Sequence, residues 1–307
     1  MIRRPPRSTQ SRSSAASDVY KRQLEYDEYN NEFSEIFSVE DSERAFEEEV
    51  MIVGFGAAPV KTEGGGVNFD SASEGYTARY THETVSLAFA LTQEAIEDNL
   101  YDQLGRRYTK ALARSMQHTK EVKGANVLNN AFDSDFTIGD GKVLIASDHP
   151  LAGGGSAANR ATTMADLNET SLEDNIIDIS TFVDDRNLTI AVRPDKIIVP
   201  PQLTFVADRL LNTPGRVNSS DNDINSIRNQ GSIPNGFSVN HYLTDPDAYF
   251  ILTSVNSDGE GLKMFNRSSL NTSMEPEFST GNIRYKARER YSFGVSNWRG
   301  VFGSQGA

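Results

Sequence analysis

The sequence contains no cysteine among its 307 residues. This absence excludes disulfide bonds, zinc sites built on cysteine and catalysis by a thiol nucleophile, and it fits a reducing compartment. The chain also lacks any run of ~18 apolar residues, so we expect no membrane-spanning helix. Its four histidines share no metal-binding spacing, and no Gly-x-Ser-x-Gly motif is present. We therefore expect no metal, no cofactor and no enzymatic activity.

Positive charge is scarce. The sequence has 30 Lys and Arg against 43 Asp and Glu, which gives a net charge of −13. Because duplex binding draws much of its strength from Lys and Arg that neutralise phosphates, this balance argues against a protein that reads nucleic-acid sequence. At 307 residues and 37% hydrophobic composition, the chain can bury a substantial core. We expect one large domain or two closely joined ones.

Residues 1–23 differ from the rest of the chain. They hold six Lys or Arg and one acid, and they show no hydrophobic periodicity. The segment has no apolar core for a secretory signal, although its Arg- and Ser-rich composition could mimic an organelle transit peptide. It is similar to a translated sequencing adapter, so we expect a non-native leader, with the true N-terminus missing upstream of Leu24.

Residues 24–50 are acidic and rich in aromatic side chains. They contain eleven Asp or Glu and one Arg, interleaved with residues such as Tyr26, Tyr29, Phe33, Phe37 and Phe46. A block this acidic repels itself and gains little from folding alone, so its aromatics need a partner. One interpretation is a disordered tail. The other, which we favour, is a partly helical arm laid along another subunit.

An extended hairpin is predicted for residues 51–91. The segments 51–56 and 77–91 are rich in Thr, Val, Tyr and Phe, as β-strands are. The glycine run between them lacks the Gly-Lys-Ser/Thr and the following helix of a phosphate-binding loop, so we expect a flexible hairpin tip. The run is Gly64, Gly65 and Gly66. Because an isolated two-stranded ribbon is marginal in water, a hairpin of this length implies neighbours.

A long helix is predicted from Asp102 to Phe132. Apolar or small residues recur at three- and four-residue steps along one face, and no proline interrupts the run. At ~1.5 Å per residue the helix would be ~45 Å long. The opposite face carries the cations Arg106, Arg107, Lys110, Arg114 and Lys120. Either this face is solvated while the helix packs across a sheet, or it meets an acidic segment of a neighbouring subunit.

The central part of the chain alternates helices and strands. Gly139-Asp140-Gly141 predicts a tight turn. A helix is expected from Ser171 to about Asp185, with Ser171 as its N-cap. A strand at Lys196–Val199 and a second helix at Leu203–Asn212 follow.

The last third of the chain is predicted to form a long polar loop followed by strands. Asn212–Gly236 is rich in Asn, Ser and Gly, and is either a functional loop or an ordinary disordered insertion. The segments 237–241 and 248–254 alternate like sheet strands. The single tryptophan, Trp298, is expected to pack in a terminal strand rather than to bind a ligand.

Residues 284–293 alternate large and charged side chains, as a half-exposed strand does. We expect this strand to pair antiparallel with a neighbour and to pack against the long helix. Its charged side, Lys286, Arg288 and Arg290, would then be available for contacts between subunits.

Several strings of residues together resemble the major capsid proteins of tailed bacteriophages. They are DGKVLIASDHPLAGGG at 140–155, SLEDNIIDI at 171–179, PDKIIVPPQLTFVADRLLNT at 194–213 and the C-terminal run at 264–304. The likeness is greatest to the Mu-like major head subunit group and spans roughly residues 45–305. These motifs are sets of structural residues without a catalytic signature, and their order and spacing carry the resemblance.

The resemblance implies the Hong Kong 97-type α+β fold. That fold has an N-terminal arm, an E-loop hairpin, a peripheral domain built on a long spine helix, and an axial domain with a central sheet. The same order of elements is predicted above from the residues alone. The corresponding divisions are a leader (1–23), the acidic arm (24–50), the E-loop hairpin (51–91), the peripheral domain (92–165), the axial domain (166–255), and strands returning through the peripheral domain with the C-terminal tail (256–307).

The function implied by the resemblance is mechanical. Copies would self-assemble, through pentamers and hexamers, into an icosahedral shell enclosing double-stranded phage DNA without sequence-specific binding. The expected partners are other copies, a portal protein, and scaffolding or decoration proteins, with no membrane. The protein would reside in the virion, and in the bacterial host cytoplasm during assembly. Contacts between subunits are expected at Arg106, Lys110, Arg114, Gly64, Gly65, Gly66, Lys286, Arg288 and Arg290.

Two other functions remain open from the sequence. One is an encapsulin-like nanocompartment shell of the same fold, and the other is a soluble α/β ligand-binding or hydrolase domain. For the latter, Asp148-His149-Pro150 might look like a dyad, but adjacent residues seldom point at one site, and we expect a structural turn. Some phages of this fold form a Lys–Asn isopeptide cross-link between subunits. Lys61 is the only hairpin lysine that could serve, and we do not expect it to do so.

Overall fold

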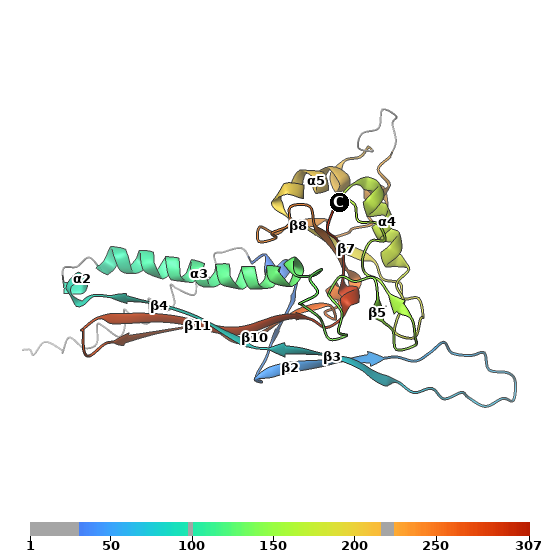
Figure 1. The fold of residues 1–307 in the computed structure, drawn as a ribbon, viewed down its shortest axis with the longest axis horizontal. Coiled ribbons are helices and arrows are strands. Elements are labelled where there is room, and N and C mark those ends of the chain that lie inside the picture. Colours follow the sequence, from blue (N-terminus) through green and yellow to red (C-terminus); the bar gives the residue numbers. More distant parts are fainter. Residues whose placement is uncertain (1–30, 98–100, 216–223) are drawn as a thin grey trace, which may run out of the picture. The chain divides into compact units, whose positions relative to one another are not determined.

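The computed structural model describes residues 31–97, 101–215 and 224–307, without the side chains of 96, 97 and 101–106. The described residues fall into two units, whose elements are labelled in Figure 1. The first unit comprises residue 31, His82–Val122 and Asn266–Tyr291. The second comprises Glu32–Thr81, Lys123–Phe265 and Ser292–Ala307.

The first unit is built on the long helix α3 (Tyr101–Asn129), whose last turns belong to the second unit. This 29-residue helix confirms the one predicted from the apolar periodicity. A short helix, α2 (Gln93–Glu97), comes before it in the chain. Leu112 and Met116 of α3 are buried against Ala287 of strand β11, so the small and apolar face of the helix is the one that meets the sheet.

A four-stranded sheet has the order β1-β10-β11-β4. Its strands are β1 (Ser38–Asp41), β10 (Leu262–Pro276), β11 (Ile283–Val295) and β4 (Glu83–Leu91). Strands β11 and β4 pair antiparallel, with Ile283 opposite Leu91 and Tyr291 opposite Glu83. The antiparallel strand and its packing on the helix confirm the prediction for residues 284–293.

The strand predicted over residues 77–91 is instead two strands with different partners. Strand β3 (Ser73–Thr81) pairs with β2 (Phe46–Val53), whereas β4 pairs with β11. The half-buried alternation falls on even positions up to His82 and on odd positions from Val85 onward. Because side chains in a strand alternate between the two faces, a shift by one residue cannot be kept within one strand. The hairpin also begins earlier than predicted, inside the acidic segment.

The second unit contains a mixed sheet with the order β12-β9-β7-β8. The strands are β12 (Val301–Ser304), β9 (Tyr249–Thr253), β7 (Pro194–Val199) and β8 (Phe237–Val239). Strands β7 and β8 are parallel, and the other two pairs are antiparallel. All five residues of β9 are buried, which explains its continuous apolar run. The strands predicted near residues 196–199, 237–241 and 248–254 are thus confirmed.

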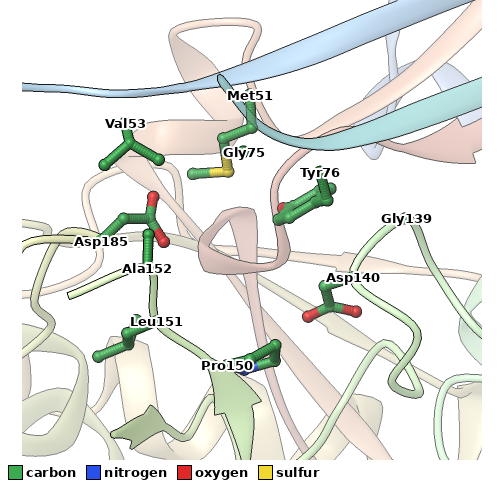
Figure 2. Close-up of a pocket in the computed structure, with 10 residues that line it drawn as sticks. All are labelled: Met51, Val53, Gly75, Tyr76, Gly139, Asp140, Pro150, Leu151, Ala152 and Asp185. Atoms are coloured by element: carbon green, nitrogen blue, oxygen red, sulfur yellow. The ribbon is translucent and has the colours of Figure 1, made fainter. Parts of the chain in front are cut away.

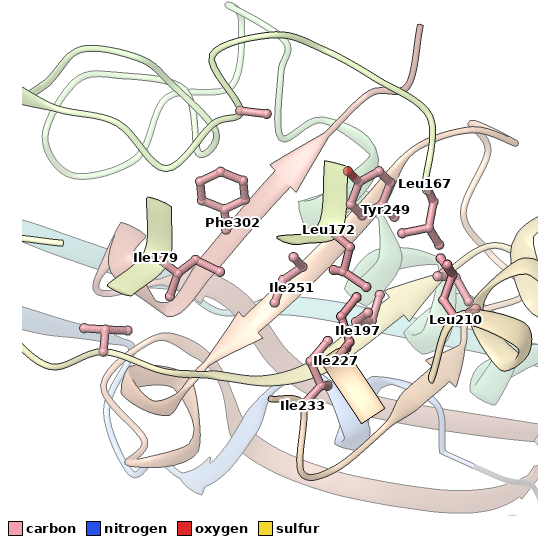
Figure 3. Close-up of a cluster of buried hydrophobic side chains, with 14 of the residues drawn as sticks. Leu167, Leu172, Ile179, Ile197, Leu210, Ile227, Ile233, Tyr249, Ile251 and Phe302 are labelled. Carbon is pink, nitrogen blue, oxygen red and sulfur yellow. The ribbon is translucent and has the colours of Figure 1, made fainter. Parts of the chain in front are cut away.

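The core of the second unit lies between this sheet and two helices (Figure 3). Helix α4 (Glu169–Ser180) contributes Leu172 and Ile179, and α5 (Thr204–Asn212) contributes Leu210. Helix α4 ends earlier than expected, and its N-cap is Asn168 rather than Ser171. The Asn168 side chain accepts from the Ser171 amide while the Ser171 hydroxyl accepts from the Asn168 amide, so Ser171 is the third residue of a capping box.

Short elements complete the second unit. They are η1 (Phe33–Glu35), β5 (His149–Pro150), β6 (Ser156–Ala157), η2 (Pro201–Leu203), α6 (Ser226–Gln230), α7 (Ser254–Ser257) and η3 (Trp298–Gly300). Helix α6 lies within the stretch predicted to be a structureless loop, because Ile227 joins the core. Residues 216–223 of that loop are outside the described residues. The tight turn predicted at Gly139-Asp140-Gly141 is confirmed, with the Gly141 amide bonded to the Ile138 carbonyl.

Three large apolar side chains of the acidic segment are buried within their own chain, so for these residues the expectation of a partner in another subunit is wrong, whereas Phe46 and Val39 stay exposed. Phe33, Ile36 and Phe37 are buried, and the rings of Phe33 and Phe37 meet Phe293 edge-on at 5.8 and 5.0 Å. The Asn256 side chain donates to the Ile36 carbonyl. The burial of three large apolar side chains holds this segment in place, in spite of its charge. Residues 24–30 lie outside the described residues.

Candidate functional site

The hairpin formed by β2 and β3 is continued by a loop, residues 54–72, that holds exposed apolar side chains (Figure 1). Val60 and Phe69 are 95% and 97% exposed, and Phe55 and Val67 are also exposed. The expected glycines form the turn at its end, where Gly64 has φ +74° and the Gly65 amide bonds to the Thr62 carbonyl at 3.0 Å. Burying such side chains is favourable by about 1.5–3 kcal/mol each, so this loop is a candidate binding surface.

A partly buried polar network fixes the base of the hairpin. Lys263 contacts Glu49 of β2 at 2.5 Å and Glu40 of β1 at 3.2 Å. The Ser296 hydroxyl donates to Glu49, and Tyr80 of β3 meets Ser296 at 2.5 Å. Burial is the main cause that raises the pKa of Tyr80, so its hydroxyl stays neutral and can donate. Both strands are thereby held to residues of β10 and to the segment after β11.

A second set of contacts, which we call the clasp, holds the two sides of the hairpin together just beyond the last paired residues of β2 and β3. The Asp70 carboxylate accepts from the amides of Gly56 and Ser71, both at 2.8 Å. The Arg186 guanidinium donates to the Ser71 carbonyl at 2.7 Å and lies 3.6 Å from Asp70. The two backbone amides are the main cause that lowers the pKa of Asp70. Sequence reasoning missed this clasp, since Arg186 lies 115 residues from Ser71 and no local pattern links them.

A cavity of about 270 Å³ lies at the root of the hairpin (Figure 2). Met51, Val53 and Tyr76 come from the two hairpin strands, and Leu151 comes from the loop after β5. The charged residues in its wall are two acids, Asp140 and Asp185. Burial, followed by the negative charge of Asp140, raises the pKa of Tyr76. No short motif in the sequence predicts this pocket, because its walls come from five separate segments.

His149 takes part in a buried structural network. Its Nδ1 lies 2.6 Å from Asp140 Oδ2 and its Nε2 lies 3.1 Å from Asn159 Oδ1. Its ring stacks on Trp298 with centroids 4.4 Å apart. Neither hydrogen-bond partner is a serine, threonine or cysteine that the imidazole could activate, and the adjacent Asp148 binds Lys142 instead. The geometry favours the structural turn over a catalytic dyad.

Trp298 is fully buried, at 0% exposure, in the core of the second unit. The Arg299 guanidinium lies 4.2 Å from the centroid of its ring and 3.3 Å from Asp185. The tryptophan packs in the core as predicted, but it lies in η3, directly before the terminal strand β12, rather than in a strand.

The cations predicted along the long helix do not share one environment. Lys110 and Arg114 are exposed, and the side chain of Arg106 is outside the described residues. Lys120 was expected on the same exposed face, but it is buried and pairs with Glu289 of β11 at 2.8 Å. The reason is the helical step: ten residues after Lys110, at ~100° per residue, the side chain has turned toward the sheet.

The charged side of β11 is placed as the alternation predicted. Lys286 and Arg288 are exposed and Arg290 is half-buried, while Tyr285, Ala287 and Glu289 are buried. The basic residues therefore lie on the face of the strand away from the helix.

Several acids of the described arm already have basic partners in the same chain. Glu35 pairs with Lys196 at 2.6 Å, and Glu32 lies 2.7 Å from His241. Glu40 and Glu49 share Lys263. These four acids thus have partners within the chain, and the pairing of the basic helix face with an acidic segment of another copy stays a prediction.

Across residues 31–97, 101–215 and 224–307, no group of three or more His, Asp or Glu side chains is arranged to hold a metal ion. None of the helices in those ranges is both long and apolar enough to cross a membrane.

Comparison with known proteins gives a family and a fold. A family model described as phage capsid protein matches residues 75–303. No curated protein matches the sequence. Among solved structures, a virus-like particle from Pyrococcus furiosus is similar at 10% identity and a TM-score of 0.54, over 92% of this chain and 95% of that one.

Two further structures are similar to the same extent. The capsid of a native GTA particle has 12% identity and a TM-score of 0.54, over 91% of this chain and 91% of that one. The capsid of Myoviridae phage XM1 has 13% identity and a TM-score of 0.53, over 91% of this chain and 92% of that one. At these identities the likeness shows the fold, and it confirms the α+β architecture expected from the sequence.

Proposed function

The chain belongs to the phage capsid protein family, and from this premise we propose that its copies close, through pentamers and hexamers, into an icosahedral shell around double-stranded DNA. As a member of that family it is a major capsid shell protein with a structural role, and its place is the virion. The family match over residues 75–303 is the observation that carries the proposal. The Hong Kong 97-type fold agrees with it.

The projecting hairpin supports the assembly part of the proposal. Its loop leaves Val60, Val67 and Phe69 exposed, and a shell offers the next copy as a place to bury them. Closed symmetric assembly repeats the same surfaces on every copy, so each hairpin would find the same partner surface. The turn glycines Gly64, Gly65 and Gly66 would lie in that contact.

Two basic surfaces are further proposed contacts between copies. One is on the long helix, with Lys110 and Arg114 exposed, and we include Arg106 from the same helix. The other is the outward side of β11, with Lys286, Arg288 and Arg290. In a chain with a net charge of −13, these cations have many acidic surfaces to meet on another copy.

The enclosed DNA would be held without sequence-specific contacts. An acidic chain suits this role, because a wall that attracted DNA strongly would impede its packaging. A portal protein, scaffolding or decoration proteins, and assembly in the host cytoplasm complete the proposal. A strongly basic inner surface in the assembled shell would contradict it.

A nanocompartment shell is the alternative with the same fold. The likeness to the Pyrococcus furiosus particle, at 10% identity, carries only the fold, and no observation favours a cargo-binding role. The other alternative, a soluble enzyme or ligand-binding domain, does not explain the projecting hairpin.

Electron microscopy and analytical ultracentrifugation of the purified chain test the proposal. Closed particles of uniform size are expected once the protein concentration is high enough for the copies to associate. Co-expression with portal and packaging proteins should give particles whose DNA resists nuclease. Particles that instead retain only a co-expressed enzyme would indicate a nanocompartment. A monomer under every assembly condition would refute a shell of either kind.

A further inference from the structure

The cavity at the hairpin root has the chemistry of a lysine-binding site. Met51 and Val53 of β2 and Leu151 supply apolar walls, and the charged residues in the wall are Asp140 and Asp185 (Figure 2). We propose that this pocket receives the Lys61 side chain from the hairpin tip of a second copy. The inference rests on the proposed shell function and names one contact within it.

The size of the pocket suits such an occupant. Its volume is about 270 Å³. An engineered apolar cavity of ~150 Å³ is large enough to bind benzene, which has six heavy atoms. A lysine side chain has five heavy atoms, so it fits with room for a water at the charged end. Lysine buries its aliphatic stem along apolar surface and keeps its ammonium at polar groups, which matches the two kinds of wall.

Asp185 is the carboxylate that would receive the ammonium. The residue is only 8% exposed, and its Oδ1 lies 3.3 Å from the Arg299 guanidinium. Figure 2 shows its carboxylate turned toward the interior of the pocket. Its second oxygen, Oδ2, has no partner among the described residues. In Asp140, by contrast, both carboxylate oxygens already have a hydrogen-bond partner. Oδ1 accepts from the Lys142 amide, and Oδ2 is bonded to His149.

Lys61 is the cation of this chain best placed to reach such a pocket on another copy. It is the only Lys or Arg in the loop 54–72, it is exposed, and the preceding Val60 is 95% exposed. Glu63 follows two residues later, so the tip has no net charge, and the Lys61 ammonium is the group that complements the two acids of the pocket. Eight residues separate Lys61 from Val53, and an extended chain covers ~26 Å in that number at ~3.3 Å per residue. The hairpin carries Lys61 away from its own pocket, which leaves a second copy as the source.

The contact has a direct consequence for assembly. A tip that enters the root of the next copy is a head-to-tail contact, with different surfaces on the two partners. Such heterologous contacts generate rings when the rotation between copies closes. This is the type of interface that pentamers and hexamers require, and each copy gives one tip and receives one.

Site-specific disulfide formation tests the contact, since the sequence has no cysteine of its own. Two single-cysteine variants, Lys61→Cys and Ala152→Cys at the exposed rim of the pocket, are given tags of different mass and assembled together with an excess of wild type. No chain holds both cysteines, so any mixed disulfide joins two copies. Mild oxidation of the particles is expected to give this mixed dimer at least tenfold above the control pair, Lys286→Cys with Ala152→Cys.

Charge variants give a second, independent measurement. Lys61→Glu is expected to lower the particle yield at least tenfold, and Lys61→Arg to retain it, with the unfolding temperature of the unassembled chain unchanged in both. Wild-type yield from Lys61→Glu, or particles that give no more mixed dimer than the control, would overturn the inference and leave the shell function standing. Failure of the wild-type chain to form particles would refute the shell function itself.

Discussion

Single buried side chains decide how the segments of the second unit are joined, and Asn159 is the clearest case. Its amide nitrogen donates to the carbonyls of Leu144, Trp298 and Val301, and its oxygen accepts from the Ala146 amide. Two of these hydrogen bonds, to Trp298 and Val301, tie the segment after the long helix to the C-terminal segment, and the other two hold Asn159 to its own segment. They also fix the orientation of the amide, because only the NH2 group can face three carbonyls.

Replacement of Asn159 by aspartate tests this role. Asn159→Asp keeps the shape of the side chain but removes the donors, so a buried carboxylate faces three acceptors. We expect the free energy of unfolding to fall by about 3 kcal/mol or more, measured by denaturant titration of the unassembled chain. The matched variant Asn229→Asp changes an exposed residue and should stay within ~0.5 kcal/mol of wild type. Equal effects from the two variants would show that Asn159 is not a junction.

Residue-level partners were the least predictable feature of the sequence. Next to His149 in the chain stands Asp148, but the carboxylate that binds its ring is Asp140, nine residues earlier. The turn predicted at Gly139-Asp140-Gly141 was correct, and it is this turn that brings Asp140 back to the histidine. Sequence patterns identified the turn, whereas the pairing depends on tertiary packing that no local spacing encodes.

Elements with strong periodicity were predicted well, and elements that change partner were not. The long helix and α5 each keep one buried face, so hydrophobic spacing locates them, and β7 and β9 are short apolar runs that lie in the interior of a sheet. The division at His82 was missed because β3 and β4 are both half-buried strands, and only the shift from even to odd buried positions separates them. The acidic block obscured β1 and the start of β2 because its charge suggested an unpaired arm.

Within the first unit, the charge pair between Lys120 of α3 and Glu289 of β11 links helix to strand. Its two side chains are 10% and 1% exposed, and the Lys120 ammonium also lies 5.1 Å from the Tyr291 ring. Burial and the nearby Glu289 charge raise the pKa of Tyr291, so its hydroxyl remains neutral beside the pair. A buried pair of this kind fixes the register of the helix on the sheet more than it adds stability.

Removing one partner of this pair should destabilise the protein, whereas replacing both partners by apolar residues should not. Lys120→Met leaves a buried carboxylate without its lysine, and we expect the free energy of unfolding to fall by about 3–5 kcal/mol. The double variant Lys120→Met with Glu289→Leu should recover most of that loss, because an apolar pair of similar volume is often neutral. Arg114→Met, on the exposed side of the same helix, is the control and should change little. A double variant as unstable as Lys120→Met alone would contradict this account.

For the whole molecule, the order of elements was enough to predict the fold, but the burial of the acidic segment was not. Phe33 and Phe37 bury themselves against Phe293 of the same chain, and Glu35, Glu40 and Glu49 find lysines there. The sequence indicates that these aromatic and acidic side chains need partners. It does not indicate whether the partners lie in the same copy or in another copy. What remains exposed after folding, the hairpin loop and the basic surfaces of α3 and β11, is therefore a better guide to assembly than composition.

The role of the basic surface of the long helix in assembly can be tested by charge reversal. Lys110 and Arg114 are exposed, so reversing both to glutamate should leave the unassembled chain folded, with its free energy of unfolding within ~0.5 kcal/mol per site. If the surface meets an acidic region of another copy, the double variant replaces attraction by repulsion at every equivalent contact of the shell. A loss of only about 1.4 kcal/mol per contact is tenfold in affinity, so particle yield should fall at least tenfold, as measured by sedimentation and electron microscopy.

The matched control reverses two exposed arginines of the second unit, Arg193→Glu with Arg228→Glu, and changes the net charge by the same amount. Particle yield from this control should exceed that of the helix variant, because a general increase in negative charge acts on both variants equally. Raising the salt concentration should narrow the difference, since screening weakens attraction between exposed charges. Normal particles from Lys110→Glu with Arg114→Glu would show that the cations of the helix are solvated, and that assembly depends on the hairpin and β11 instead.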